Sequence, residues 1–231
     1  MRWLYRKYAH FILRPYWQWK LSKMVVYRSH GLRMEIPPGV FHPGYFFSTE
    51  YLLAFLLRQD WKDKDFLELG CGSGLISLVL AGRGARVTAV DINPAAVIAL
   101  QQNASVHQLE LEVRESDLFS ALNDRRFSAI AINPPYYRKD PADMAQRAWY
   151  AGGQFEYFKA LFATLRPHLL ATSQVWMVLS EDCALREIET IAHQHHFELK
   201  LLDSRTFRFE AQNIYGIIDR KLTSHPDGFV S

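Results

Sequence analysis

The sequence of 231 residues has only two cysteines, Cys71 and Cys183, which excludes a disulfide-stabilised fold and a thiolate-rich metal centre. This cysteine usage is typical of a reducing compartment, and we predict a cytoplasmic location. No apolar run reaches the roughly 18–20 residues that a membrane-spanning helix needs, so no transmembrane segment is predicted. Hydrophobic residues make up 49% of the chain, enough to bury a sizeable core.

Acidic residues are missing from one part of the chain. Residues 1–34 hold eight of the 27 Lys and Arg residues and none of the 24 Asp and Glu residues, so the rest of the chain is net acidic. Trp3, Trp17 and several other aromatic residues lie in the same basic segment. We expect helices between residues 3 and 27, interrupted at Pro15, and we divide the chain into a basic aromatic helical extension at 1–40 and a domain at 41–231.

The basic extension admits three roles at this stage. The first role is an amphipathic cover for the sheet, with the charges in solvent. The second is a nucleic-acid contact, in which Arg and Lys bind phosphates and aromatic rings stack on bases. The third is a helix on a membrane surface, a position that basic segments with Trp can take. The oligomeric state is left open.

Beyond residue 50, apolar strands alternate with helical patterns, which predicts a doubly wound α/β fold. Seven strands are expected, mostly parallel, and the short connection between the last two makes the final strand antiparallel. The predicted strands are Phe66–Leu69, Arg86–Val90, Leu111–Arg114, Phe127–Ile132, Val175–Leu179, Glu198–Leu202 and Ile214–Ile218. The predicted helices are Tyr51–Arg58, with Ser48 or Thr49 as its N-cap, Leu75–Ala81, Pro94–Val106, Phe155–Leu165 and Ala184–His195.

A glycine-rich turn follows the first predicted sheet strand. Gly70, Gly72 and Gly74 allow a tight turn and a close approach of the backbone to a ligand, and Glu68 precedes them. The next strand ends in Asp91, where a carboxylate can bind both hydroxyls of a ribose. Asp117 ends the third strand-helix unit, in the stretch Glu115-Ser116-Asp117-Leu118, and can be an acceptor for an adenine amine, the N-cap of a helix, or both. The spacing lacks the glycine at position 75 that a pyrophosphate loop would have.

The stretch Asn133-Pro134-Pro135-Tyr136 follows another apolar strand. The Asn133 side-chain oxygen and the Pro134 carbonyl can accept hydrogen bonds from both N–H groups of a planar NH₂, and the Tyr136 ring can stack on its face. By itself the stretch can also be an ordinary turn, because Asn-Pro initiates turns. Placed after a parallel strand and across from a cofactor loop, it predicts chemistry on a planar nitrogen.

Together these motifs resemble the S-adenosylmethionine-binding motifs of class I methyltransferases, which have a Rossmann-like fold. With Asn133-Pro134-Pro135-Tyr136 and the later Gly152-Gly153, the chain is similar to the HemK-like (release-factor glutamine methyltransferase) branch. The resemblance implies catalytic roles for Asn133, Pro134, Pro135 and Tyr136. It implies an S-adenosylmethionine site formed by Thr49, Glu68, Gly70, Cys71, Gly72, Gly74, Asp91, Ile92, Asp117, Leu118 and Asn133.

The resemblance implies an N-methyltransferase that acts on a planar NH₂ group, with a protein glutamine amide as the first expected substrate. The chain departs from this branch because it lacks a release-factor-binding helical domain of normal length, which leaves the substrate open. The alternative is an RNA adenine-N6 or guanine-N2 amine, which the basic extension favours, and a small-molecule amine is third. The non-enzyme alternative is a binding protein that keeps the fold without catalysis. We read Cys71 as a small loop filler and predict no metal site.

Overall fold

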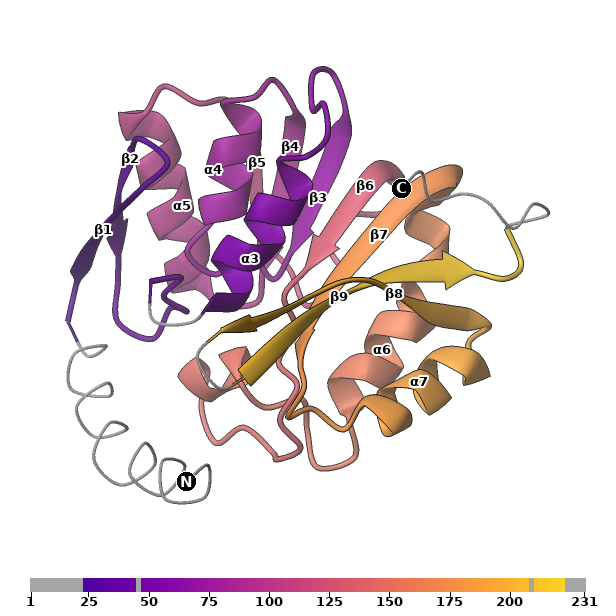
Figure 1. Ribbon diagram of the computed structural model, residues 1–231. Coiled ribbons are helices and arrows are strands. Elements are labelled where there is room, and N and C mark those ends of the chain that lie inside the picture. The colour runs from indigo at the N-terminus through magenta and orange to yellow at the C-terminus, as the bar shows by residue number, and fades with distance from the viewer. Residues whose placement is uncertain (1–22, 45–46, 208–209, 223–231) are drawn as a thin grey trace.

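The computed structural model describes residues 23–44, 47–207 and 210–222 of the chain. Its described part begins with an antiparallel hairpin of β1 (Val25–Ser29) and β2 (Leu32–Ile36). His30 and Gly31 connect the two strands, and both have positive φ angles (51° and 77°), as a tight hairpin turn requires. The hairpin is a separate two-stranded sheet beside the main one (Figure 1).

The main sheet has seven strands in the order β5-β4-β3-β6-β7-β9-β8 (Figure 1). Strands β3, β4, β5, β6 and β7 are paired with one another in parallel. Strand β9 is antiparallel to both of its neighbours, β7 and β8. This confirms the predicted mostly parallel sheet with an antiparallel last strand. The strands are β3 (Asp65–Leu69), β4 (Arg86–Asp91), β5 (Glu112–Glu115), β6 (Phe127–Ile132), β7 (Leu169–Ser180), β8 (Phe197–Phe207) and β9 (Glu210–Asp219).

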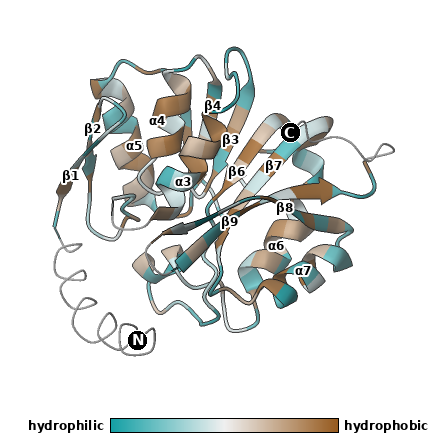
Figure 2. Cartoon of the chain, in the orientation of Figure 1, coloured by the Kyte–Doolittle hydropathy of each residue, from teal (hydrophilic) through white to brown (hydrophobic). Residues whose placement is uncertain are grey.

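Helices cover both faces of this sheet, which makes it doubly wound. One apolar core joins α3, α4 and α5 to one face, and a second core joins α6 and α7 to the other. Successive strand residues alternate between the cores: Phe66 belongs to one and Leu67 to the other. Hydropathy colouring shows the apolar interior in strands such as β3 and β6 (Figure 2). The helices are α3 (Phe47–Leu56), α4 (Leu75–Ala81), α5 (Pro94–Val106), α6 (Glu156–Thr164) and α7 (Leu185–Gln194), with short 3-10 turns η2 (Ala145–Ala148) and η3 (Arg166–His168).

Two predictions about local structure are wrong. Strands β8 and β9 extend well beyond the predicted apolar segments, because backbone pairing continues through polar residues such as Ser204 and Asn213. Helix α3 begins at Phe47, so Ser48 and Thr49 lie inside its first turn and neither is the N-cap. In both cases tertiary pairing set a boundary that the side-chain pattern did not mark.

The predicted helical character of the extension at 1–40 is wrong for β1 and β2, which form a hairpin from Val25 to Ile36. Residues 1–22 lie outside the described part of the chain. The hairpin is fixed to the main body because Asn103 of α5 pairs with the backbone of Glu35: Glu35 N donates to Asn103 Oδ1 at 2.9 Å, and Asn103 Nδ2 donates to Glu35 O at 3.0 Å. The division at residue 40 stays a prediction.

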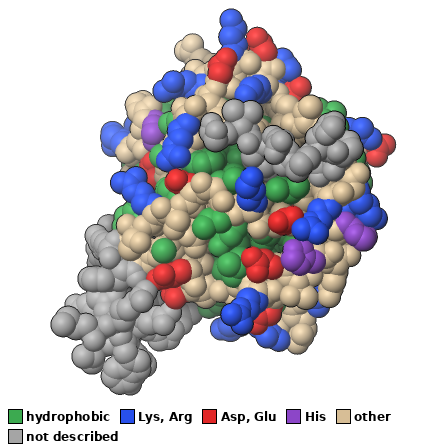
Figure 3. Space-filling model, turned by 45° about the vertical axis from the view of Figure 1, so that its right-hand side comes forward, with side chains coloured by type: hydrophobic (Ala, Val, Ile, Leu, Met, Phe, Trp, Pro, Cys, Tyr) green, Lys and Arg blue, Asp and Glu red, His purple; other side chains and the backbone are tan. Residues whose placement is uncertain are grey.

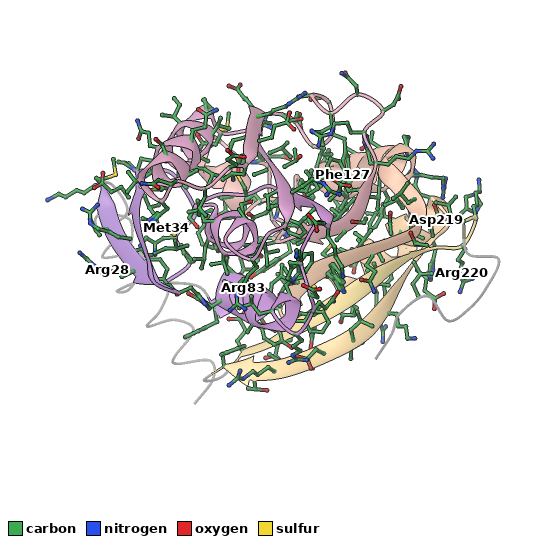
Figure 4. The ribbon with its side chains drawn as sticks, turned by 90° about the horizontal axis from the view of Figure 1, so that it is seen from above. Arg28, Met34, Arg83, Phe127, Asp219 and Arg220 are labelled. Atoms are coloured by element: carbon green, nitrogen blue, oxygen red, sulfur yellow. The ribbon has the colours of Figure 1, made fainter. Side chains whose placement is uncertain are left out.

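Seen from above, Arg28 and Met34 mark the hairpin at one end of the molecule, and Asp219 and Arg220 mark the end of β9 at the other (Figure 4). Within the described ranges, no helix is long and apolar enough to cross a membrane. The same residues contain no cluster of three His, Cys, Asp or Glu side chains suited to a metal ion.

Candidate active site

A cleft of about 410 Å³ opens at the carboxyl ends of β3, β4 and β6. Ligands of open α/β sheets bind at this edge, because the loops that follow parallel strands converge there. All predicted site residues line the cleft except Gly74. The structure therefore brings together the glycine-rich turn, Asp91, Asp117 and the Asn133–Tyr136 stretch.

The glycine-rich turn has two kinds of glycine. Gly70 has φ +75° and faces open space, since an added Cβ would meet no atom within 4 Å. Gly74 has the same φ, but an added Cβ would lie 2.3 Å from Leu100 Cδ1. Gly70 thus leaves room for a ligand, whereas Gly74 allows α4 to pack against α5. Gly74 does not line the cleft, and its expected part in the cofactor loop stays a prediction.

Asp91 holds the glycine-rich turn in place. Its carboxylate accepts hydrogen bonds from Gly72 N at 2.7 Å and from Asn93 N at 2.8 Å. Burial raises the pKa of Asp91, and the backbone hydrogen bonds oppose that effect. Each carboxylate oxygen keeps a further acceptor site, so Asp91 can bind hydroxyl groups in the cleft while it organises the turn.

Glu68 connects β3 to the first turn of α4. It is only 5% exposed, and its Oε2 accepts hydrogen bonds from Ser77 N and Ser77 Oγ. Burial raises the pKa of Glu68 to about 8, and the two hydrogen bonds from Ser77 act in the opposite direction.

Cys71 is buried in the same turn. Burial raises the pKa of its thiol well above the ordinary value, and the nearby carboxyls of Asp91 and Glu68 add to the effect. A thiol with a raised pKa is a poor nucleophile. This environment agrees with the reading of Cys71 as a loop filler.

Two hydroxyl groups of α3 orient the Asn133 amide. Asn133 Nδ2 donates to Ser48 Oγ at 3.2 Å and to Thr49 Oγ1 at 3.1 Å. Because the nitrogen is held in this way, Asn133 Oδ1 is the atom of the amide that remains as an acceptor on the cleft side. From the sequence, Ser48 was predicted only as a possible helix N-cap, and no motif indicated its contact with Asn133.

The first turn of α3 is itself tied to the hairpin through Glu50. Tyr27 Oη donates to Glu50 Oε1 at 2.6 Å, Ser29 Oγ donates to the same oxygen at 2.7 Å, and His30 Nε2 lies 3.1 Å from Glu50 Oε2. Burial acts against the charged form, yet these hydrogen bonds lower the pKa of Glu50. The hairpin therefore supports the helix turn that orients Asn133.

Tyr136 stays neutral on the acceptor side. Burial, followed by the neighbouring Tyr137, raises the pKa of Tyr136 far above its ordinary value. The two rings lie 4.8 Å apart between centroids with an interplanar angle of 56°. Pro134 is buried and Pro135 half-buried beside them. Tyr136 can therefore contribute an aromatic surface, and it is not a base at physiological pH.

A loop from residues 137 to 152 forms the outer wall. Tyr137 N donates to Trp149 O at 3.1 Å, and Ala151 N donates to Tyr137 O at 2.9 Å. The Trp149 ring lies 5.1 Å from the Phe41 ring, which joins this wall to the segment after β2. Trp149, Arg147 and Phe41 all line the cleft, and Phe41 was not anticipated from the sequence.

Asp117 and Leu118 lie at the rim near Tyr157. Asp117 is exposed and precedes a turn, so the helix N-cap interpretation is wrong. Burial raises the pKa of Tyr157, and the charges of Asp91 and Asp117 add to it. No motif in the sequence indicated Tyr157, whose apolar spacing on α6 looks like that of a core residue.

The cleft fits S-adenosylmethionine in size and chemistry. Its volume lies within the roughly 300–1,000 Å³ typical of small-molecule sites. Asp91 offers acceptors for ribose hydroxyls, Ile92 and Leu118 offer apolar surface for an adenine, and the open backbone at Gly70 admits the methionine part.

Comparison with known proteins gives relatives that act on two classes of substrate. The chain is 40% identical over 123 residues to the release factor glutamine methyltransferase of Koribacter versatilis, covering 51% of this chain and 43% of that protein. It is 35% identical over 141 residues to the ribosomal RNA small subunit methyltransferase C of Pasteurella multocida, covering 60% of this chain and 40% of that protein. The chain thus spans about half the length, or less, of these relatives.

Solved structures share the fold at low sequence identity. The 16S rRNA N2 methyltransferase RsmC of T. thermophilus, solved with AdoMet and guanosine, matches with a TM-score of 0.59 and 22% identity, covering 84% of this chain and 50% of that one. The E. cuniculi Mtq2–Trm112 complex, which methylates a translation termination factor, matches with a TM-score of 0.59 and 17% identity, covering 78% of this chain and 98% of the other. The model of the methyltransferase small domain matches residues 31–188, and the chain therefore belongs to the methyltransferase small domain family, which confirms the resemblance to class I methyltransferases.

Proposed function

We propose that the protein is an S-adenosylmethionine-dependent N-methyltransferase that acts on a planar NH₂ group. The observation that carries this proposal is the fixed Asn133 amide, whose nitrogen is held by Ser48 and Thr49 in the cleft that the glycine-rich turn also lines. An amide fixed in this orientation presents an oxygen acceptor, which suits a substrate nitrogen that carries two hydrogens.

Residues on both sides of the cleft have separate tasks. The turn from Gly70 to Gly72, with Asp91, would hold the cofactor, which supplies an electrophilic methyl group on a sulfonium. Asn133 Oδ1 and the Pro134 carbonyl would accept the two N–H groups of the substrate. These bonds counter delocalisation of the nitrogen lone pair and stabilise the positive charge that develops on the nitrogen. Fixing the nitrogen in line with the methyl group supplies further acceleration, and its proton then passes to solvent.

The first substrate we propose is a protein glutamine amide. Its support comes from the release factor glutamine methyltransferases, which align with this chain at up to 40% identity. The mouth of the cleft also suits a peptide, since Tyr136, Tyr137 and Trp149 offer aromatic surface. A glutamine amide has the planar NH₂ geometry that Asn133 and Pro134 can accept.

An RNA adenine-N6 or guanine-N2 amine is the second candidate. It is favoured by the match to ribosomal RNA small subunit methyltransferase C over 60% of this chain. The basic composition of residues 1–34 supports the same class of substrate, since phosphate contacts depend on Lys and Arg. A binding protein without catalysis is disfavoured by the orientation of Asn133, whose amide nitrogen is held by Ser48 and Thr49 so that its oxygen stays available as an acceptor.

Methyl transfer into cell lysate distinguishes these substrates. The full chain is incubated with S-adenosylmethionine carrying a labelled methyl group and with lysate treated by either protease or RNase. We expect protease to abolish the labelled macromolecule. Loss of the label only after RNase would replace the glutamine proposal by the RNA one. No label in any sample, together with no heat of cofactor binding in calorimetry, would overturn the enzyme proposal.

A further inference from the structure

A second polar cluster lies where β7 ends and β9 begins. Ser180 is the last residue of β7, Glu210 is the first of β9, and Gln212 pairs with Ser180 across the two strands. Ser180 Oγ donates a short hydrogen bond to Glu210 Oε1, and Gln212 Nε2 donates to the same oxygen at 2.9 Å. We call these three residues the Glu210 cluster.

The Glu210 cluster has acceptor capacity that the described residues do not use. Gln212 is 5% exposed, and its Oε1 has no hydrogen-bond partner. Rotating the amide would not help, because it would place that oxygen against Glu210 Oε1. Buried polar atoms usually have partners, so an orphaned oxygen points to a missing donor.

The charge of Glu210 is also unbalanced within the described part of the chain. Both donors to its Oε1 are neutral groups, and no described Lys, Arg or His forms an ion pair with it. Arg205 lies opposite Gln212 in the β8–β9 ladder, but its guanidinium lies over the Phe207 ring at 5.2 Å. The cluster thus combines one negative charge with a buried free acceptor.

The position of the cluster relates it to the methyl acceptor. Glu210 pairs with Phe207, whose ring stacks on Phe47 at 5.2 Å with an interplanar angle of 5°. Phe47 begins α3, and the next residue, Ser48, accepts the hydrogen bond from Asn133. The charge of Glu210 also contributes to the raised pKa of Tyr136. Ser180, Glu210 and Gln212 do not line the cleft themselves, and the stacked Phe207 and Phe47 rings connect the cluster to the first turn of α3 on the acceptor side.

We propose that the Glu210 cluster is a subsite for a cationic group, an alkylammonium or a guanidinium, that the methyl-accepting polypeptide carries beside its target nitrogen. This inference rests on the proposed protein substrate. The cation would donate to Gln212 Oε1 and to Glu210 Oε2, which are charge-assisted bonds of the stronger kind. The Phe47 and Phe207 rings offer apolar surface to its aliphatic stem. The phosphates of RNA would be repelled by the same carboxylate.

Direct binding tests the subsite without any methyl transfer. Agmatine, which carries both cationic groups, and the neutral N-butylacetamide are titrated into the full chain and followed by NMR. We expect agmatine to bind at least about tenfold more weakly to the Glu210→Gln and Gln212→Met variants, while Glu198→Gln, which removes an exposed acid at the far end of β8, binds as the original chain does. Equal agmatine affinity in all four proteins would overturn the subsite.

A peptide series separates the subsite from the substrate class. Three matched glutamine peptides carry Lys, norleucine or Glu next to the glutamine. We expect methylation in that order of preference, and we expect Glu210→Gln to bring the Lys and norleucine peptides to the same kcat/KM. Agmatine binding that depends on Glu210, with no peptide methylated, would sink the glutamine proposal and keep the subsite. Methylation without charge preference would overturn the subsite and keep the glutamine proposal.

Discussion

The two sides of the cleft are built in different ways. The cofactor side consists of the turn after β3 and the end of β4. Gly72 N donates a hydrogen bond to the Asp91 carboxylate there, and the two residues are only 19 positions apart in the sequence. The acceptor side joins Asn133 to Ser48 and Thr49, which lie 85 and 84 residues away. The first side is held mainly by backbone conformation and the second by contacts between distant side chains.

This difference predicts how each side responds to mutation. A change on the cofactor side alters the shape of a short turn and so affects cofactor binding and stability together. A change on the acceptor side removes a side-chain contact and leaves the turn intact. The space-filling view shows apolar side chains in the middle of one face, with charged groups around them (Figure 3).

The largest expected effect is that of Asn133→Ala. Removal of the oriented acceptor should lower kcat by about 100- to 1,000-fold, the usual loss for a group that stabilises developing charge. Cofactor affinity measured by calorimetry should stay within about twofold of the original, because the glycine-rich turn does not depend on Asn133. Unchanged turnover would refute the acceptor role, and a large loss of cofactor affinity would show that the two sides are not separate.

A smaller effect is expected for Asp91→Asn. The substitution keeps the shape of the side chain but removes the negative charge of the carboxylate, which accepts hydrogen bonds from Gly72 N and Asn93 N. Hydrogen bonds to charged groups contribute about 1.5–3 kcal/mol, so cofactor affinity should fall by about 10- to 150-fold. Calorimetry measures the affinity, and thermal unfolding measures the accompanying loss of stability. A variant that binds the cofactor normally would show that Asp91 only organises the turn.

Thr49→Val should have a moderate effect. Valine has a similar shape but cannot accept a hydrogen bond from Asn133 Nδ2. A hydrogen bond of this kind contributes about 0.5–1.5 kcal/mol, so kcat should fall by about 2- to 12-fold. Thr49→Ser is the matched control and should restore the rate. Steady-state kinetics and calorimetry together distinguish two roles: a fall in cofactor affinity would support the predicted cofactor contact, and a fall in kcat alone would support the positioning of Asn133.

The last prediction concerns the pH dependence of stability and Glu68. Because burial raises its folded-state pKa to about 8, the folded protein binds more protons at this group than the unfolded chain does between about pH 4.5 and 8. This group should therefore lower the free energy of unfolding as pH rises through that window. Urea unfolding at several pH values should show a flatter dependence for Glu68→Gln, and an identical slope in both proteins would contradict the raised pKa.

The sequence revealed much of the fold because its signals were local. The start of α5 at Pro94 and the apolar strand Phe127–Ile132 were found at their observed positions, since the preference of proline for a first turn and the burial of a strand both act over a few residues. The ends of β8 and β9 could not be found in this way, because polar residues there form strands through pairing with a neighbouring strand. The hairpin at Val25–Ile36 was missed for the same reason: its strands depend on each other and on α5.

The sequence by itself determined the cofactor side of the site, because tight turns and strand ends follow from glycine spacing and from the acid that ends the next strand. Only the tertiary structure decided how the acceptor side is held. The contact of Ser48 and Thr49 with Asn133, the link from Glu50 to the hairpin, and the Glu210 cluster all join segments that are far apart along the chain. Such contacts depend on how α3 and β9 pack against the sheet, and no local pattern of residues encodes that packing.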